Sequence, residues 1–163
     1  MTHQEEQIRA LCQALLCAGK TLATAESCTG GGIAKALTEL PGSSAVFLGG
    51  AVTYTNALKE SLLGVPREIL KQHTEVSAPC AKAMAEGIRV RTGASLAVSA
   101  TGYAGPGGGT DRDPVGTVYI GIASPRACFA ERFSAPTNAT RREIREAVIL
   151  RALELLLQEA EQL

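Results

Sequence analysis

The sequence contains no tryptophan, and only 4% of its 163 residues are aromatic. The 16 Lys and Arg residues are balanced by 16 Asp and Glu residues, so the formal net charge at pH 7 is zero. Proteins that bind nucleic acids present a basic surface, and those that bind single strands add aromatic side chains on which bases stack. We therefore expect no nucleic-acid partner.

The chain also lacks an apolar run long enough to cross a bilayer, and residues 1–6 are too polar and acidic for a secretion signal. The five cysteines are scattered without a Cys-x-x-Cys pair, and the two histidines lie far apart in the sequence. These features predict a cytoplasmic protein with reduced cysteines, no membrane contact and no structural metal.

What the sequence does contain is a regular alternation of short apolar segments with segments of helical spacing. Strands are predicted over 21–25, 45–54 and 95–101, a hairpin over 115–123 and 127–133, and helices over 5–18, 27–40, 56–63, 67–72, 77–91 and, capped by Thr137 or Asn138, up to 158. This order predicts a three-layer α/β/α single domain over residues 1–163. Its sheet is expected to be mixed, with parallel strands and a C-terminal antiparallel hairpin.

Polar stretches follow each of the three strands expected to be parallel. Ser27 follows the first, Tyr54 and Lys59 follow the second, and Thr101 ends the third. The carboxyl ends of strands in open α/β sheets form the edge where ligands bind. We therefore expect these side chains to converge on one site.

Ser27 stands where a strand turns into a helix, within the segment Thr-Ala-Glu-Ser-Cys-Thr-Gly-Gly-Gly over residues 24–32. A helix start offers unpaired N–H groups, here near Thr29, Gly30 and Gly31, and glycines let the backbone approach a ligand closely. The segment therefore suits a serine nucleophile with an oxyanion site. The alternative is an ordinary capped helix with a flexible entry.

A serine hydroxyl needs a base, and neither histidine is well placed to serve as one. Lys59 is the better candidate, provided that its pKa lies about three units below the reference value of ~10.4. The alternative is a surface lysine. Tyr54 is either a hydrogen-bond donor to Lys59 or to the substrate, or an aromatic side chain packed in the core.

Two neighbours of Ser27 admit alternative roles. Glu26 either orients Lys59 or interacts with the helix dipole, and the second role is at least as well supported because a close carboxylate would keep the lysine protonated. Cys28 is a rival nucleophile at a helix start, or a small buried apolar side chain. We favour Ser27 as the nucleophile.

The loop over residues 102–114 is rich in glycine and matches neither a Walker motif nor a dinucleotide fingerprint. Its backbone N–H groups, at Gly102, Gly105, Gly107 and Gly108, can form a nest for an anion, or the loop is merely a flexible connection. Arg141 and Arg142 near the start of the last helix either bind a phosphate or are solvated.

Four motifs occur together and in order. They are residues 24–31, residues 53–56 with Lys59, residues 99–102 with Ala-Gly-Pro at 104–106, and Pro-Val-Gly-Thr-Val at 114–118. This set resembles the CinA carboxy-terminal domain family over nearly the whole chain. Tyr103 departs from the family pattern, in which an aliphatic residue is more common.

The stand-alone members that the chain resembles are nicotinamide-nucleotide amidases. The resemblance implies a hydrolase without a cofactor that converts nicotinamide mononucleotide to nicotinate mononucleotide and ammonia, in pyridine nucleotide recycling. It implies a catalytic Ser27–Lys59 pair with Tyr54 beside it. The glycine loop, Thr101 and Arg142 are then expected to hold the nucleotide. Longer CinA proteins carry an additional pyrophosphatase-like domain, which we do not expect here.

The sequence leaves two other functions open. One is a nucleotide-binding or regulatory module that keeps the pocket without turnover, and the other is an amidase that depends on Cys28. A homo-oligomer is also plausible, because the last helix has a leucine-rich face with Leu150, Leu153 and Leu157. These leucines suit the protein core equally well.

Overall fold

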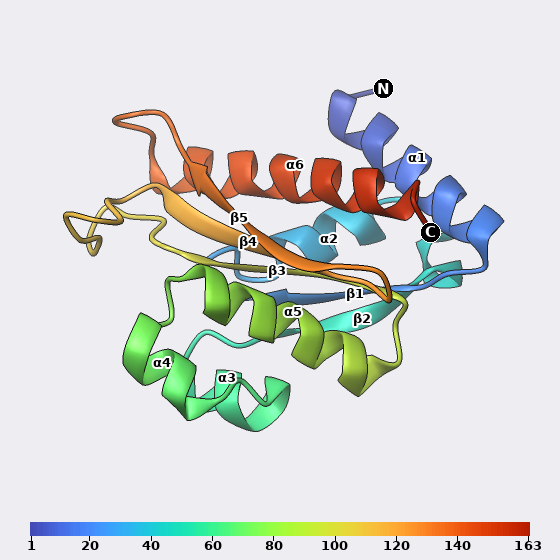
Figure 1. The fold of residues 1–163 in the computed structure, drawn as a ribbon. Helices are drawn as coiled ribbons and strands as arrows, with labels where there is room; N and C mark the ends of the chain where they lie inside the picture. Colours follow the sequence, from blue (N-terminus) through green and yellow to red (C-terminus); the bar gives the residue numbers. More distant parts are fainter.

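The computed structural model describes all 163 residues as a five-stranded sheet between two layers of helices (Figure 1). The helices are α1 (His3–Ala18), α2 (Gly32–Thr38), α3 (Asn56–Leu63), α4 (Arg67–His73), α5 (Ala78–Thr92) and α6 (Arg141–Ala160). The strands are β1 (Leu22–Glu26), β2 (Phe47–Val52), β3 (Leu96–Gly102), β4 (Thr117–Ala123) and β5 (Cys128–Ser134). A short 3₁₀ helix covers Ser43–Ala45.

The strands are arranged in the order β2-β1-β3-β4-β5. Strand β1 is parallel to both β2 and β3, whereas β4 is antiparallel to β3 and to β5. All five residues of β1 are buried, as expected for a central strand covered on both faces. The predicted mixed sheet with a C-terminal antiparallel hairpin is confirmed.

Helices α1, α2 and α6 cover one face of the sheet, and α3, α4 and α5 lie on the other (Figure 1). The larger hydrophobic core lies under α1 and α6 and includes Leu11 and Leu153. The smaller one lies under α5 and includes Met84 and Ile88. The three predicted layers therefore follow from burying an apolar stripe of each helix against the sheet.

The leucines of α6 belong mainly to this core. Leu153 is fully buried, Leu157 packs against the same cluster, and Leu150 is half-buried. Their positions favour the core interpretation over an oligomer interface.

No helix of the chain combines the length and the apolar composition that crossing a membrane would require.

Two predicted helix starts are wrong. Helix α2 begins at Gly32 and ends at Thr38, and so is shorter than the 27–40 segment, because residues 27–31 form a turn. Helix α6 is capped by Thr140 instead of Thr137 or Asn138. The Thr140 hydroxyl accepts a hydrogen bond from the N–H of Glu143, whose carboxylate accepts one from the N–H of Thr140. This reciprocal pair sets the register of the first turn.

Candidate active site

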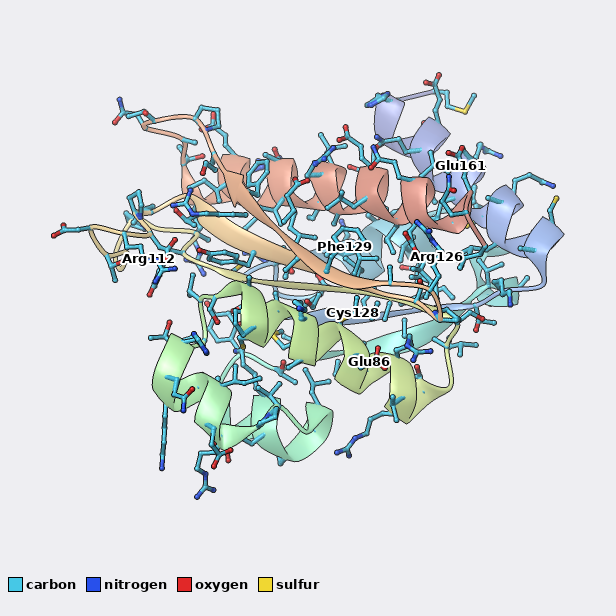
Figure 2. All side chains as sticks on the ribbon, in the orientation of Figure 1. Glu86, Arg112, Arg126, Cys128, Phe129 and Glu161 are labelled. Carbon is cyan, nitrogen blue, oxygen red and sulfur yellow. The ribbon has the colours of Figure 1, made fainter.

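The parallel pairing brings the ends of β1, β2 and β3 to one edge of the sheet. The N–H of Ser27 donates to the carbonyl of Ala100 (2.9 Å), and the N–H of Thr53 donates to the carbonyl of Glu26 (2.8 Å). These bonds extend the ladders beyond the strands and hold the following residues side by side. The glycine-rich loop with Arg112 lies at this end of the molecule, opposite the turn that carries Arg126 (Figure 2).

A cavity of about 220 Å³ opens at this edge. Its walls come from the turn after β1, the segment after β2, the connection before α5, the end of β3 and the first turn of α6. The lining residues are Ser27, Cys28, Tyr54, Asn56, Lys59, Glu75, Val76, Thr101, Gly102, Tyr103, Ala104 and Arg141. The structure thus gathers the predicted Ser27, Tyr54, Lys59, Thr101 and Gly102 around one cavity.

Lys59 is the largest fully buried side chain of the protein, with 1% of its surface exposed. It lies on α3, whose N-cap Thr55 accepts a hydrogen bond from Leu58. Its Nζ atom lies 3.1 Å from Ser27 Oγ and donates to the carbonyl of Thr53 at 2.8 Å. The surface-lysine alternative is therefore wrong.

The protonation state of Lys59 follows from its surroundings. Burial lowers the pKa of Lys59, and the negative charges that Cys80, Glu75 and Cys28 can carry oppose this shift more weakly. A buried amine loses its hydration as a cation, so burial shifts the equilibrium toward the neutral form. A neutral lysine beside a serine hydroxyl can accept its proton.

Cys28, the rival nucleophile, lies in an environment that disfavours its ionised form. Its side chain is buried, and this burial raises the pKa of Cys28 to about 12. The residue therefore carries a thiol at neutral pH and lacks the thiolate that a cysteine nucleophile requires. This environment favours Ser27 over Cys28 as the nucleophile.

Glu26 forms no hydrogen bond or ion pair with Lys59. One of its carboxylate oxygens accepts hydrogen bonds from the Thr29 hydroxyl (2.7 Å) and the N–H of Ile33 (2.8 Å), and the other accepts one from the N–H of Ala34 (3.0 Å). Two of these donors are unpaired N–H groups of the first turn of α2. Of the two roles open for Glu26, the structure supports the interaction with the helix N-terminus.

The turn after Ser27 needs glycine at two positions, because Gly30 and Gly31 have φ angles of 61° and 94°. The N–H of Gly30 donates to the carbonyl of Ser27, so it is not free for a ligand. The N–H groups of Cys28, Thr29 and Gly31 donate to no backbone carbonyl. Of these three residues only Cys28 lines the cavity, and Thr29 is fully buried. None of the residues Thr29–Gly31, where the oxyanion donors were expected, lines the cavity, so the N–H of Cys28 beside the nucleophile is the better candidate.

Tyr54 is 58% exposed, so its interpretation as a core aromatic is wrong. Its hydroxyl accepts a hydrogen bond from Arg141 (2.9 Å), and it makes none with Lys59. The same guanidinium donates to the carbonyl of Gly105 (2.7 Å). Arg141 thus joins the segment after β2 to the glycine loop and closes one wall of the cavity.

Some of the remaining predicted binding residues line the cavity, and others lie outside it. Thr101 lines the cavity, and its hydroxyl donates to the carbonyl of Glu75 (2.7 Å). Gly107 and Gly108 are exposed on the loop and do not line the cavity. Arg142, with 88% of its side chain exposed, pairs with Glu146 on the helix surface. Arg141, and not Arg142, lines the cavity.

The sequence offered Arg141 and Arg142 as phosphate ligands and favoured Arg142, whereas the lining residue Glu75 was missed. The Thr-x-x-Glu capping box at Thr140 and Glu143 is a signal in the sequence that would have assigned Arg141 to the first helical position. No such signal exists for Glu75, which comes from the connection between α4 and α5 instead of following a strand. No group of three or more His, Cys, Asp and Glu side chains is arranged to hold a metal ion.

Comparison with known proteins identifies relatives of the whole fold. The model of the CinA C-terminal domain matches residues 4–160. A CinA-like protein of Parasynechococcus marenigrum is 49% identical over 140 residues, which cover 85% of this chain and 33% of that protein. One of Myxococcus xanthus is 58% identical over 108 residues, covering 66% and 26%. The chain matches between about a quarter and a third of the length of these relatives.

Solved structures of similar length share the complete fold. The competence/damage inducible protein CihA of Agrobacterium tumefaciens has a TM-score of 0.92 and 42% identity, covering 97% of this chain and 96% of that one. A CinA superfamily protein of Klebsiella pneumoniae has a TM-score of 0.93 and 31% identity, covering 99% and 100%. The chain belongs to the CinA C-terminal domain family.

Proposed function

We propose that this domain is a nicotinamide-nucleotide amidase that hydrolyses the carboxamide of nicotinamide mononucleotide with Ser27 and Lys59. The observation that carries the proposal is the buried Lys59 amine 3.1 Å from the Ser27 hydroxyl. Burying an amine costs free energy, and the two hydrogen bonds of Lys59 beside the cavity do not offset that cost. Fold stability therefore does not explain why this lysine is buried. The substrate is inferred from the resemblance to the stand-alone amidases and from the charges of the cavity walls.

In the first half of the reaction, neutral Lys59 accepts the proton of the Ser27 hydroxyl as Oγ attacks the carboxamide carbon. The oxyanion that forms is stabilised by the N–H group of Cys28, and one such donor is worth about 3 kcal/mol in comparable sites. The protonated lysine then gives its proton to the departing nitrogen. Ammonia leaves, and the acyl group remains on Ser27.

In the second half, a water molecule attacks the ester carbon while Lys59 accepts one of its protons. Collapse of the intermediate breaks the bond to Oγ, and the serine oxygen recovers a proton from Lys59. Nicotinate mononucleotide is released, and the neutral lysine is ready for another cycle. The same residue serves as base and acid in both halves, which requires a pKa below the usual lysine value.

Arg141 is the group best placed to bind the nucleotide phosphate. It lines the cavity, its guanidinium is oriented by Tyr54 and Gly105, and guanidinium groups match phosphate geometry. With the carboxamide at Ser27, the phosphate would lie toward the glycine loop. Tyr54 therefore acts here as a residue that positions Arg141.

The test is the release of ammonia from nicotinamide mononucleotide by the native protein and by Ser27→Ala, with Ser61→Ala as a matched control on the exposed surface of α3. We expect release by the native protein and the control, and loss in Ser27→Ala. Full release by Ser27→Ala would overturn the serine mechanism. No release from a native protein that still binds the nucleotide would identify a binding module.

A further inference from the structure

Glu75 is the one acidic side chain in the wall of the active-site cavity. It is half-buried in the connection between α4 and α5, and its carboxylate accepts no hydrogen bond and forms no ion pair within the chain. The mechanism given above makes no use of it. A carboxylate without a partner in the wall of a cavity is free to interact with a ligand that enters it.

The position of Glu75 is well defined by its backbone. Its carbonyl accepts the hydrogen bond from Thr101 at the end of β3. The preceding Thr74 has a φ angle of 67°, which is unusual for a residue with a side chain, and its carbonyl accepts a hydrogen bond from the Ser77 hydroxyl. The connection is therefore anchored on both sides of Glu75, at a constrained backbone position.

The charged groups of the cavity come from opposite faces of the sheet. Glu75 precedes α5 on one face, and Arg141 begins α6 on the other (Figure 1). Ser27 and Lys59 line the same cavity, with the lysine neutral in its active form. A ligand that fills this cavity therefore meets a negative and a positive group at different walls. This arrangement favours a ligand with both charges over one that is only an anion.

We propose that Glu75 is a specificity residue that contacts the positively charged ring of the substrate, so that the site prefers N-substituted pyridinium carboxamides to analogues with a neutral ring. This inference rests on the proposed function and extends it. In nicotinamide mononucleotide the ring nitrogen is quaternary and positive, while the phosphate is negative. Glu75 then recognises the ring and Arg141 the phosphate.

The experiment compares two ligands with the same carboxamide and ribose phosphate, one with a cationic aromatic ring and one whose ring is neutral because a hydride has been added to it. They are nicotinamide mononucleotide and its dihydro form, which has a neutral ring and the same ribose phosphate. Dissociation constants are measured by titration calorimetry on Ser27→Ala, which prevents turnover, and on Ser27→Ala with Glu75→Gln. Because the Glu75 charge also raises the pKa of Lys59, both constants are measured at several pH values, which separates a change in the protonation of Lys59 from loss of the contact with the ring.

We expect Ser27→Ala to bind the cationic ring more tightly, and Glu75→Gln to reduce that preference about tenfold by weakening the cationic ligand alone. Glu68→Gln, which removes the same charge from the exposed surface of α4, should leave the ratio unchanged. A ratio unaffected by Glu75→Gln, or an equal loss for both ligands, would overturn the inference.

The outcome also separates this inference from the proposed reaction. If the native protein releases no ammonia but the preference for the cationic ring depends on Glu75, the recognition stands and the amidase proposal fails. If ammonia is released and the ratio is insensitive to Glu75, the amidase stands and the inference fails. If neither ligand binds, both fail.

Discussion

The Nζ atom of Lys59 lies 3.1 Å from the Oγ atom of Ser27, across 32 positions of sequence. Ser27 is held at the end of β1 by its bond to Ala100, and Lys59 is held by the capped helix α3 after β2. Both positions depend on the parallel pairing of these strands. The pair therefore forms only in the folded protein, and its chemistry can be tested one property at a time.

The first prediction concerns Lys59 as the base. Lys59→Met removes the amine and keeps an unbranched side chain, and we expect the rate of ammonia release to fall by about 10²–10⁴, the range for loss of a general base. Ligand binding measured by calorimetry should change little. Lys71→Met on exposed α4 is the control. A Lys59→Met rate close to the native one would exclude this role.

The second prediction concerns the pH dependence of activity. Burial lowers the pKa of Lys59, and only the neutral amine can accept the serine proton. The value of kcat/KM should therefore fall about tenfold per pH unit below that pKa and level off above it. Measurement of initial rates over a buffer series gives the midpoint. A midpoint at the usual lysine value of 10.5 would contradict the effect of burial.

The third prediction concerns stability. Because the folded-state pKa of Lys59 lies below the unfolded value of about 10.5, the unfolded chain binds more protons between these two values. The free energy of unfolding of the native protein, relative to Lys59→Met, should therefore rise with pH through this window. Above 10.5 the difference should become constant. Urea unfolding at several pH values measures it, and a difference independent of pH would contradict the shift.

The fourth prediction concerns Cys28. Since burial raises its pKa to about 12, iodoacetamide at neutral pH should modify the exposed Cys17 first and leave Cys28 intact. Mass spectrometry of peptides identifies the modified residues. Cys28→Ala should retain ammonia release within a few-fold. Loss of activity in step with early alkylation of Cys28 would instead support a thiol mechanism.

The fifth prediction concerns the turn after the nucleophile. A Cβ atom on Gly30 would lie 2.7 Å from Nη2 of Arg145, which donates to the carbonyl of Thr29. Gly30→Ala should destabilise the fold by about 2–3 kcal/mol and reduce activity. Gly19→Ala is the matched control, because Gly19 has nearly the same φ (63°) but open space around it, so only backbone strain of about 1 kcal/mol applies. Equal losses in both variants would show that the Arg145 contact is unimportant.

Arg141 and Arg142 offer a further comparison. Arg141→Met should lower kcat/KM for nicotinamide mononucleotide about 10- to 100-fold, the range for loss of a charged hydrogen bond. Arg142→Met should have little effect, since this side chain pairs with Glu146 on the surface. With nicotinamide riboside, which lacks the phosphate, the Arg141 effect should disappear. An equal loss with both substrates would assign Arg141 a structural role.

The order of helices and strands could be predicted from the sequence, because hydrophobic periodicity and turn residues act over a few positions. The parallel strands followed from the helices between them, and their carboxyl ends correctly indicated where Ser27, Lys59 and Thr101 would meet. Helix starts were less certain where several capping residues compete, as Thr137, Asn138 and Thr140 do before α6.

The tertiary structure alone decided how each polar side chain is used. The burial of Lys59, the exposure of Tyr54, the contact of Glu26 with α2 and the place of Glu75 in the cavity all depend on groups distant in the sequence. Adjacent Arg141 and Arg142 differ for the same reason, since 100° of rotation per helical residue directs one to the cavity and the other to the surface. Local propensity determines the elements, whereas burial and the pKa of a side chain depend on what packs against it.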